Sequence, residues 1–93
     1  MKGPARHDAD GPSEAEIARA LEALARQRGA GRTFCPSEAA RALAPEDWRG
    51  LMPRVRRVAA ALQRAGRLQA MLKGRPVAPE AARGPIRLGL PRG

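Results

Sequence analysis

The chain has 93 residues, enough for one small domain with a modest core. It carries 18 Lys and Arg against 9 Asp and Glu, a net charge of +9, and no apolar run in it is long enough to span a membrane. Residues 1–12 contain no apolar segment of the kind found in signal peptides, and the single Cys cannot form an internal disulfide. These features predict a cytoplasmic protein.

The positive charge is concentrated in the second half of the chain. Residues 1–47 contain seven basic and eight acidic side chains, whereas residues 48–93 contain eleven basic ones and a single acid, Glu80. A GC-rich codon bias would explain the preference for arginine over lysine, but it would not explain the loss of acids after Asp47. A one-sided field of this kind concentrates polyanions near a protein, so the sequence predicts an anion-binding surface.

A polar tail and a capped helix open the chain. Residues 1–12 show no periodicity, so we expect a disordered tail, and we interpret the lone His7 within it as a solvated residue. Ser13 and Glu16 match a capping box at the start of a helix that ends at Gly29. This helix carries one apolar stripe, which is typical of a core-facing helix.

A very short strand and a second helix follow. Residues 33–35 favour an extended backbone, and the proline after them predicts a helix over 36–43. Cys35 has no partner in a recognisable catalytic motif, so we interpret it as a structural residue. Residues 45–48 predict an isolated helical turn that places Trp48 in the core.

The most informative stretch is 53–65, which predicts a third helix with two distinct faces. Pro53 suits the first helical position, and Gly66 suits the left-handed position just past the end. The apolar face comprises Val55, Val58, Ala59 and Leu62. The opposite face comprises Arg56, Arg57, Ala60 and Arg64.

Cations in the first turn of this helix would give an independent indication of a bound anion. A start at Pro53 places Arg54, Arg56 and Arg57 there, where each opposes the helix dipole by about 0.3–1 kcal/mol. A bound polyanion would remove that penalty, because helix N-termini attract phosphate. The indication weakens if the helix begins near Pro45.

Two alternating segments near the end of the chain predict paired strands. Leu68, Ala70 and Leu72 alternate with Gln69, Met71 and Lys73. In the same way, Ile86, Leu88 and Leu90 alternate with Arg87 and Gly89. We expect an antiparallel pair joined by one long basic loop over 73–87, with Gly and Pro at both of its ends.

The order of these elements predicts an α+β fold that is mainly α: a winged helix-turn-helix with three helices and a small antiparallel β-hairpin wing. It would occupy 13–90 as a single domain, followed by a short C-terminal tail at 91–93. The side chains expected in the core are Ile17, Leu21, Leu24, Phe34, Leu43, Trp48, Val55, Val58, Leu62, Leu68 and Leu88.

The sequence also resembles a known family. The segments TFCPSEAARAL, WRGLMPRVRRVAAAL, KGRPV and GPIRL, at these spacings, are similar to those of a family of short bacterial proteins classified as a domain of unknown function. The resemblance covers residues 14–90. It implies a winged-helix-like fold and a bacterial, cytoplasmic origin, and it implies no activity, ligand or catalytic residue.

The leading interpretation is a nucleic-acid-binding module whose partner is duplex DNA. The helix over 53–65 would enter the major groove, and the wing over 73–87 would contact the backbone. The binding residues expected are Arg54, Arg56, Arg57, Arg64, Lys73, Arg75, Arg83 and Arg87. The small Ala60 and Ala61 offer little base readout, so we expect weak sequence specificity.

The alternative is a winged helix that binds an acidic protein partner through the same basic face. An enzyme is a third, disfavoured interpretation, because the chain has no metal-ligand spacing, no nucleophile–base pair and no Gly-rich phosphate loop. We therefore expect no catalytic residue, no metal and no cofactor. No long terminal helix is present to form a dimerisation arm, so we expect a monomer.

Overall fold

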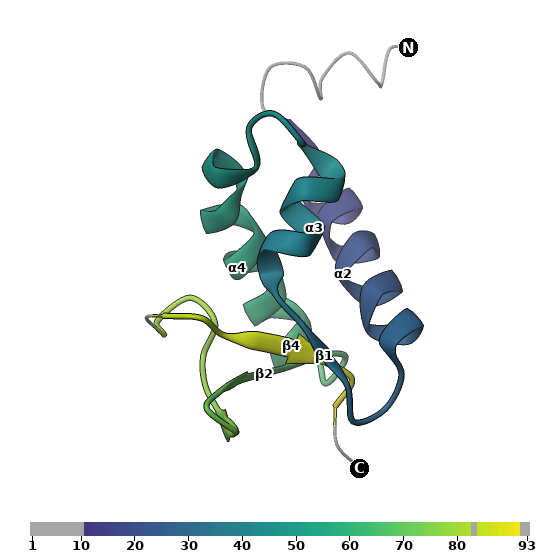
Figure 1. Cartoon of the computed structure of the whole chain (residues 1–93), viewed down its shortest axis with the longest axis vertical. Coiled ribbons are helices and arrows are strands. Elements are labelled where there is room, and N and C mark those ends of the chain that lie inside the picture. The colour runs from purple at the N-terminus through teal and green to yellow at the C-terminus, as the bar shows by residue number, and fades with distance from the viewer. Residues whose placement is uncertain (1–10, 83, 92–93) are drawn as a thin grey trace.

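The computed structural model describes residues 11–82 and 84–91. Its elements, in chain order, are α2 (Glu14–Arg28), β1 (Thr33–Phe34), α3 (Pro36–Leu43), α4 (Trp48–Arg64), β2 (Gln69–Leu72), β3 (Arg75–Pro76) and β4 (Arg87–Gly89). The helices pack together at one end of the molecule and the sheet lies at the other (Figure 1). This is the predicted α+β, mainly helical arrangement of a winged helix-turn-helix. The predicted disordered tail lies outside the described residues, except for its last two positions.

Local signals set most helix ends where the sequence predicts them. The Ser13 hydroxyl accepts a hydrogen bond from the Glu16 N–H, and the Glu16 carboxylate accepts one from the Ser13 N–H, which completes the capping box. At the end of α4, the N–H groups of Gly66 and Arg67 bond to the carbonyls of Gln63 and Leu62. Gly66 has a φ of 78°, so the helix closes in the left-handed turn expected there.

An ion pair between Arg28 and Glu38 links the end of α2 to the first turn of α3. The Glu38 carboxylate accepts hydrogen bonds from the Cys35 N–H and from the guanidinium of Arg28 at the end of α2. The hydrogen bond from Arg28 is the main reason that the pKa of the Glu38 carboxyl lies below its ordinary value. Cys35 itself is half-buried, and its sulfur accepts a hydrogen bond from the Ser37 hydroxyl at 3.1 Å, as befits a structural residue.

The sheet has four short strands in the order β1-β4-β2-β3, and every pair is antiparallel. The predicted pairing of the two alternating segments is therefore confirmed, with β4 opposite β2. Phe34, Leu88 and Ala70 face one another across β1, β4 and β2, and all three are fully buried. This row of side chains is the floor on which the helices pack.

The expectation of one long loop over 73–87 is wrong, because β2 turns directly into β3. Lys73 and Gly74 have φ values of 52° and 81°, so they form a two-residue hairpin turn of the type that matches strand twist. Pro76 is tolerated in β3 because this strand lies at the edge of the sheet. Residues 77–86 then return across the molecule to β4.

The expected start of the third helix is also wrong. Helix α4 begins at Trp48 and continues through Pro53, although a proline there removes one backbone hydrogen bond. The reason is tertiary: Leu51 extends the apolar stripe of Val55, Val58 and Leu62 by one helical turn, and it is 5 % exposed. The three arginines expected in the first turn therefore lie farther along the helix, and the dipole argument does not apply to them.

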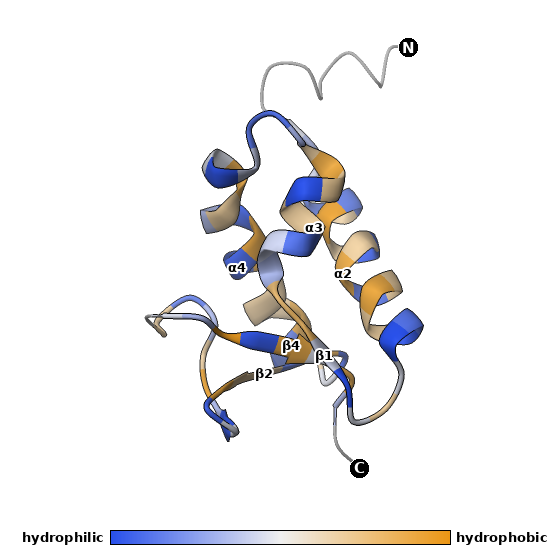
Figure 2. Cartoon of the chain, in the orientation of Figure 1, coloured by the Kyte–Doolittle hydropathy of each residue, from blue (hydrophilic) through white to orange (hydrophobic). Residues whose placement is uncertain are grey.

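The core joins the facing sides of the three helices to the inner face of the sheet (Figure 2). Eight of the expected core side chains are buried, namely Ile17, Leu21, Phe34, Val55, Val58, Leu62, Leu68 and Leu88. Leu24, Leu43 and Trp48 are instead half-buried at its margin. Ala39, Ala40 and Ala59 are also fully buried, and their small side chains let α3 and α4 pack closely.

Candidate nucleic-acid interface

The arginine-rich front of α4 divides into a covered side and an open side. Arg56 lies on the covered side. Its Nη1 donates to the carbonyls of Pro79 at 3.3 Å and Ala82 at 3.0 Å, and its Nη2 donates to the carbonyl of Gly84 at 3.2 Å. A half-buried guanidinium with three carbonyl partners holds the returning segment against the helix. Arg56 therefore has a structural role, and we call its three hydrogen bonds the Arg56 clamp. It does not belong to the candidate interface.

The second half of α4 is covered by the same returning segment, residues 77–84. The Gln63 amide donates to the Val77 carbonyl at 2.9 Å, and its oxygen accepts the Ala70 N–H. Ala60 lies between Arg56 and Gln63 on this side of the helix and is only 2 % exposed. The expectation that Ala60 lies on the exposed front is wrong, because hairpin and return segment fold over it.

The open side of α4 presents the remaining arginines of the helix. Arg57 is exposed, and it has no ion-pair partner among the residues that the structure describes. The Arg64 side chain is 69 % exposed, with its Nη1 3.6 Å from Oε1 of Glu80, the single acid in the second half of the chain. Arg54 is half-buried and already has a partner, which makes it a poorer contact for an external anion.

The wing contributes further cations. Lys73 and Arg75 flank the tip of the β2–β3 hairpin, and both are exposed. Arg87 on β4 is also exposed, but its guanidinium donates to the hydroxyl of Thr33 at 3.0 Å and to the carbonyl of the same residue at 3.1 Å. The remaining predicted wing residue, Arg83, lies outside the described residues.

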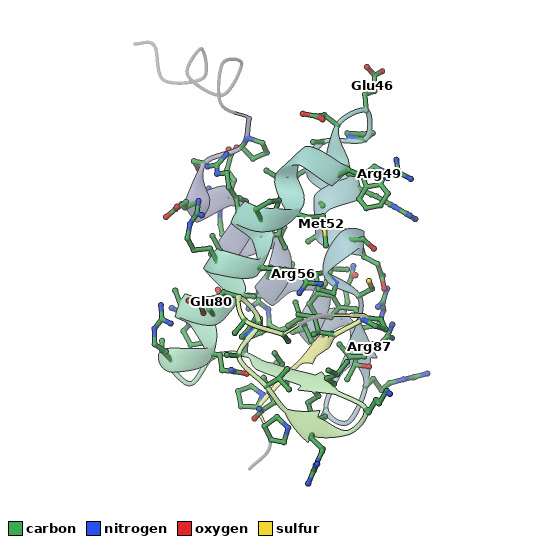
Figure 3. The ribbon with its side chains drawn as sticks, turned by 90° about the vertical axis from the view of Figure 1, so that its left-hand side faces the viewer. Glu46, Arg49, Met52, Arg56, Glu80 and Arg87 are labelled. Carbon is green, nitrogen blue, oxygen red and sulfur yellow. The ribbon has the colours of Figure 1, made fainter. Side chains whose placement is uncertain are left out.

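A shallow groove lies between the first half of α4 and the return segment. It has a volume of about 570 Å³, and in Figure 3 Arg49, Met52 and Arg56 follow one another down the helix beside it. The lining residues are Arg49, Met52, Pro53, Arg56, Arg57, Glu80 and Ala82. The groove thus exposes the N-terminal half of α4, which is the part that a helix-turn-helix recognition helix uses for base contacts.

The corner between α3 and α4 holds two cations that the sequence interpretation missed. The guanidinium carbons of Arg41 and Arg49 lie 4.3 and 4.4 Å from the centroid of the half-buried Trp48 ring. Arg49 occupies the first turn of α4, which contains no acid, and the preceding Asp47 makes no capping hydrogen bond through its side chain. A sequence prediction that continued the third helix back through Pro53 would have placed Arg49 on the same side of the helix as Arg56, about two turns earlier. It would then have counted Arg49 among the candidate binding residues.

The sequence profile of one protein family, described as a protein of unknown function, DUF3253, matches residues 14–91. The chain belongs to the DUF3253 family. This confirms the resemblance to a domain of unknown function. None of the curated proteins compared with it matches the chain.

For this DUF3253 chain, the candidate interface consists of exposed cations. Within residues 11–82 and 84–91, no group of three or more His, Cys, Asp and Glu side chains could hold a metal ion. No helix in that same part of the chain is both long and apolar enough to cross a membrane. What the site can do chemically is donate charged hydrogen bonds to an anion.

Proposed function

We propose that this domain binds duplex DNA as a monomer in the cytoplasm of a bacterium, and that it has no catalytic role. The observation that carries the proposal is the open face made by the first half of α4 and the hairpin tip, where Arg49, Arg57, Lys73 and Arg75 are exposed and make no ion pair with any described residue. A winged helix-turn-helix uses its third helix and its wing for DNA contacts, which supports this use of the face.

The proposed interface is smaller than the one expected from the sequence. Arg56 is engaged by backbone carbonyls and Arg64 lies beside Glu80, so about three or four cations can reach phosphates at once. Counterion release then gives a log–log salt slope of about −3 to −4 for duplex DNA. We assign the exposed arginines of the helix to phosphates, and Met52 and Pro53 beside them cannot hydrogen-bond to bases, so we expect weak sequence preference and an affinity of about 10⁻⁴ to 10⁻⁶ M.

The direct test is a titration of labelled duplex DNA, single-stranded DNA and RNA at two or more salt concentrations. Arg57→Ala should weaken duplex binding and make the salt slope shallower by about one unit, because one phosphate contact is lost. The matched control is Arg26→Ala, which removes the same charge from an exposed position in the last turn of α2. The control should leave the slope unchanged.

Two outcomes would contradict the proposal. The first is that Arg57→Ala and Arg26→Ala change the duplex affinity and the salt slope equally. Binding would then depend only on the net charge of the chain. The second is no salt-dependent binding of the wild-type chain to any nucleic acid at about 50 mM salt. In that case the face would be assigned to an acidic protein partner, because Met52, Pro53 and Ala82 provide an apolar floor between the arginines of the groove.

Glu80 gives a prediction of the opposite sign. Glu80→Gln should tighten duplex binding and steepen the salt slope by up to about one unit, because Arg64 is then available to a phosphate. Fluorescence anisotropy of labelled duplex measures both quantities. The gain should disappear when Glu80→Gln is made together with Arg64→Ala, since a double-mutant cycle isolates this pair. If Glu80→Gln gives an equal gain in affinity with Arg64 present and with Arg64→Ala, Glu80 acts through the overall electrostatic field of the protein and not through Arg64.

A further inference from the structure

The corner between α3 and α4 carries a stacked cation cluster, Arg41–Trp48–Arg49. The two arginines come from different helices, and their guanidinium carbons lie 4.3 and 4.4 Å from the centroid of the same indole. Trp48 is half-buried, with part of its ring packed against the core, so the ring is a fixed platform. This platform holds two cations from different helices at one place on the surface.

Neither cation is neutralised by a carboxylate among the described residues. In the described part of the chain, Arg41 and Arg49 have no carboxylate within 4 Å, although Glu46 and Asp47 are close to them in the sequence. Two arginines elsewhere are paired: Arg28 with Glu38, and Arg67 with Glu22. Two adjacent like charges repel each other, so the cluster is most stable with an anion between or beside them.

Resting on the proposed function, we infer that the Arg41–Trp48–Arg49 cluster binds a phosphodiester group of the duplex. A cation–π contact does not consume the N–H groups of a guanidinium, which therefore stay available to oxygen acceptors. The ring holds these groups in position, so less side-chain entropy is lost when the phosphate binds. Because two guanidinium carbons lie within 4.4 Å of the ring centroid, the ring is already covered, and the site suits a phosphate better than a stacked base.

The position of the cluster selects the DNA backbone as its partner. Arg49 lines the same groove as Arg57, so a strand that contacts Arg57 continues past the corner. Figure 3 shows Arg49 at the far end of this row from the sheet, with Met52 and Arg56 following it. The cluster and the hairpin tip therefore lie at opposite ends of the proposed interface, and both would contact phosphates outside the base pairs that α4 faces.

The chain contains its own reporter for this site, because Trp48 is the single tryptophan. We expect its fluorescence to change on titration with unlabelled duplex DNA, with the same midpoint as the anisotropy of labelled duplex. Arg49→Ala and Arg41→Ala should each make the salt slope shallower by about one unit, while Arg26→Ala should not. Arg49→Lys keeps the charge but loses the planar fork, so it should recover only part of the affinity.

The outcomes separate this inference from the proposed function. If anisotropy reports duplex binding while Trp48 emission stays constant and Arg41→Ala and Arg49→Ala behave like Arg26→Ala, the cluster is not a phosphate site and the proposed function stands. If the emission changes but neither arginine variant alters the slope, the phosphate contact is likewise refuted. If no duplex binds at all, both the inference and the proposed function fail. Circular dichroism of each variant shows that it is folded.

Discussion

Leu62→Ala should lower the free energy of unfolding by about 2–5 kcal/mol, a large share of the stability of a domain this small. Leu62 is 8 % exposed and continues the stripe of Leu51, Val55 and Val58 along α4. Removing its side chain leaves a cavity between this helix and the rest of the core, and close-packed neighbours relax only partly into it. Urea or thermal denaturation followed by circular dichroism measures the loss.

Leu43→Ala is the matched control for this prediction. It makes the same chemical change at the end of α3, where the leucine is half-buried at the margin of the core. Its effect should be clearly smaller, because solvent can fill the space that is left. A loss below about 1 kcal/mol for Leu62→Ala would mean that the faces of α4 are assigned the wrong way round.

Arg56→Ala should lower the free energy of unfolding by about 1–3 kcal/mol, because three backbone carbonyls lose a charged donor. The loss should be local. Amide hydrogen exchange in residues 77–84 should rise more than exchange in the buried strands, since this segment is held to α4 mainly by Arg56 and Gln63. Denaturant titration and hydrogen exchange together measure both effects.

Arg57→Ala is the matched control, because it removes the neighbouring arginine from the same helix. Arg57 is exposed and has no ion-pair partner among the described residues, so its stability effect should stay within about 0.5 kcal/mol. The two variants should therefore affect different properties. Arg57→Ala changes the salt dependence of binding, whereas Arg56→Ala changes the free energy of unfolding. If Arg56→Ala keeps full stability and changes only the salt slope, the clamp is refuted and Arg56 belongs to the interface.

Local features of the sequence were sufficient for much of the fold. The capping box at Ser13, the proline that starts α3 and the glycine after α4 each act over a few residues, so they can be recognised without tertiary information. The alternation in β2 and β4 indicates a sheet with one buried face in the same way. The uneven distribution of charge along the chain is likewise a property of the sequence alone.

The extent of α4 required tertiary structure. Pro53 and Gly50 both weaken a helix locally, and a local interpretation ends the preceding turn there. The burial of Leu51 against the core outweighs that cost, and it moves the start of the helix to Trp48. This shift removes Arg54, Arg56 and Arg57 from the first turn and brings Arg49 into it.

The sequence by itself determined that this protein would have three helices, a small antiparallel sheet and a basic second half. Only the tertiary structure decided which arginines face outward, because that depends on where the return segment 77–84 lies. Its carbonyls engage Arg56, and its Glu80 lies beside Arg64. The helical periodicity places Arg56 and Arg57 on one polar front, but hydrogen bonds between residues more than twenty positions apart divide that front in two.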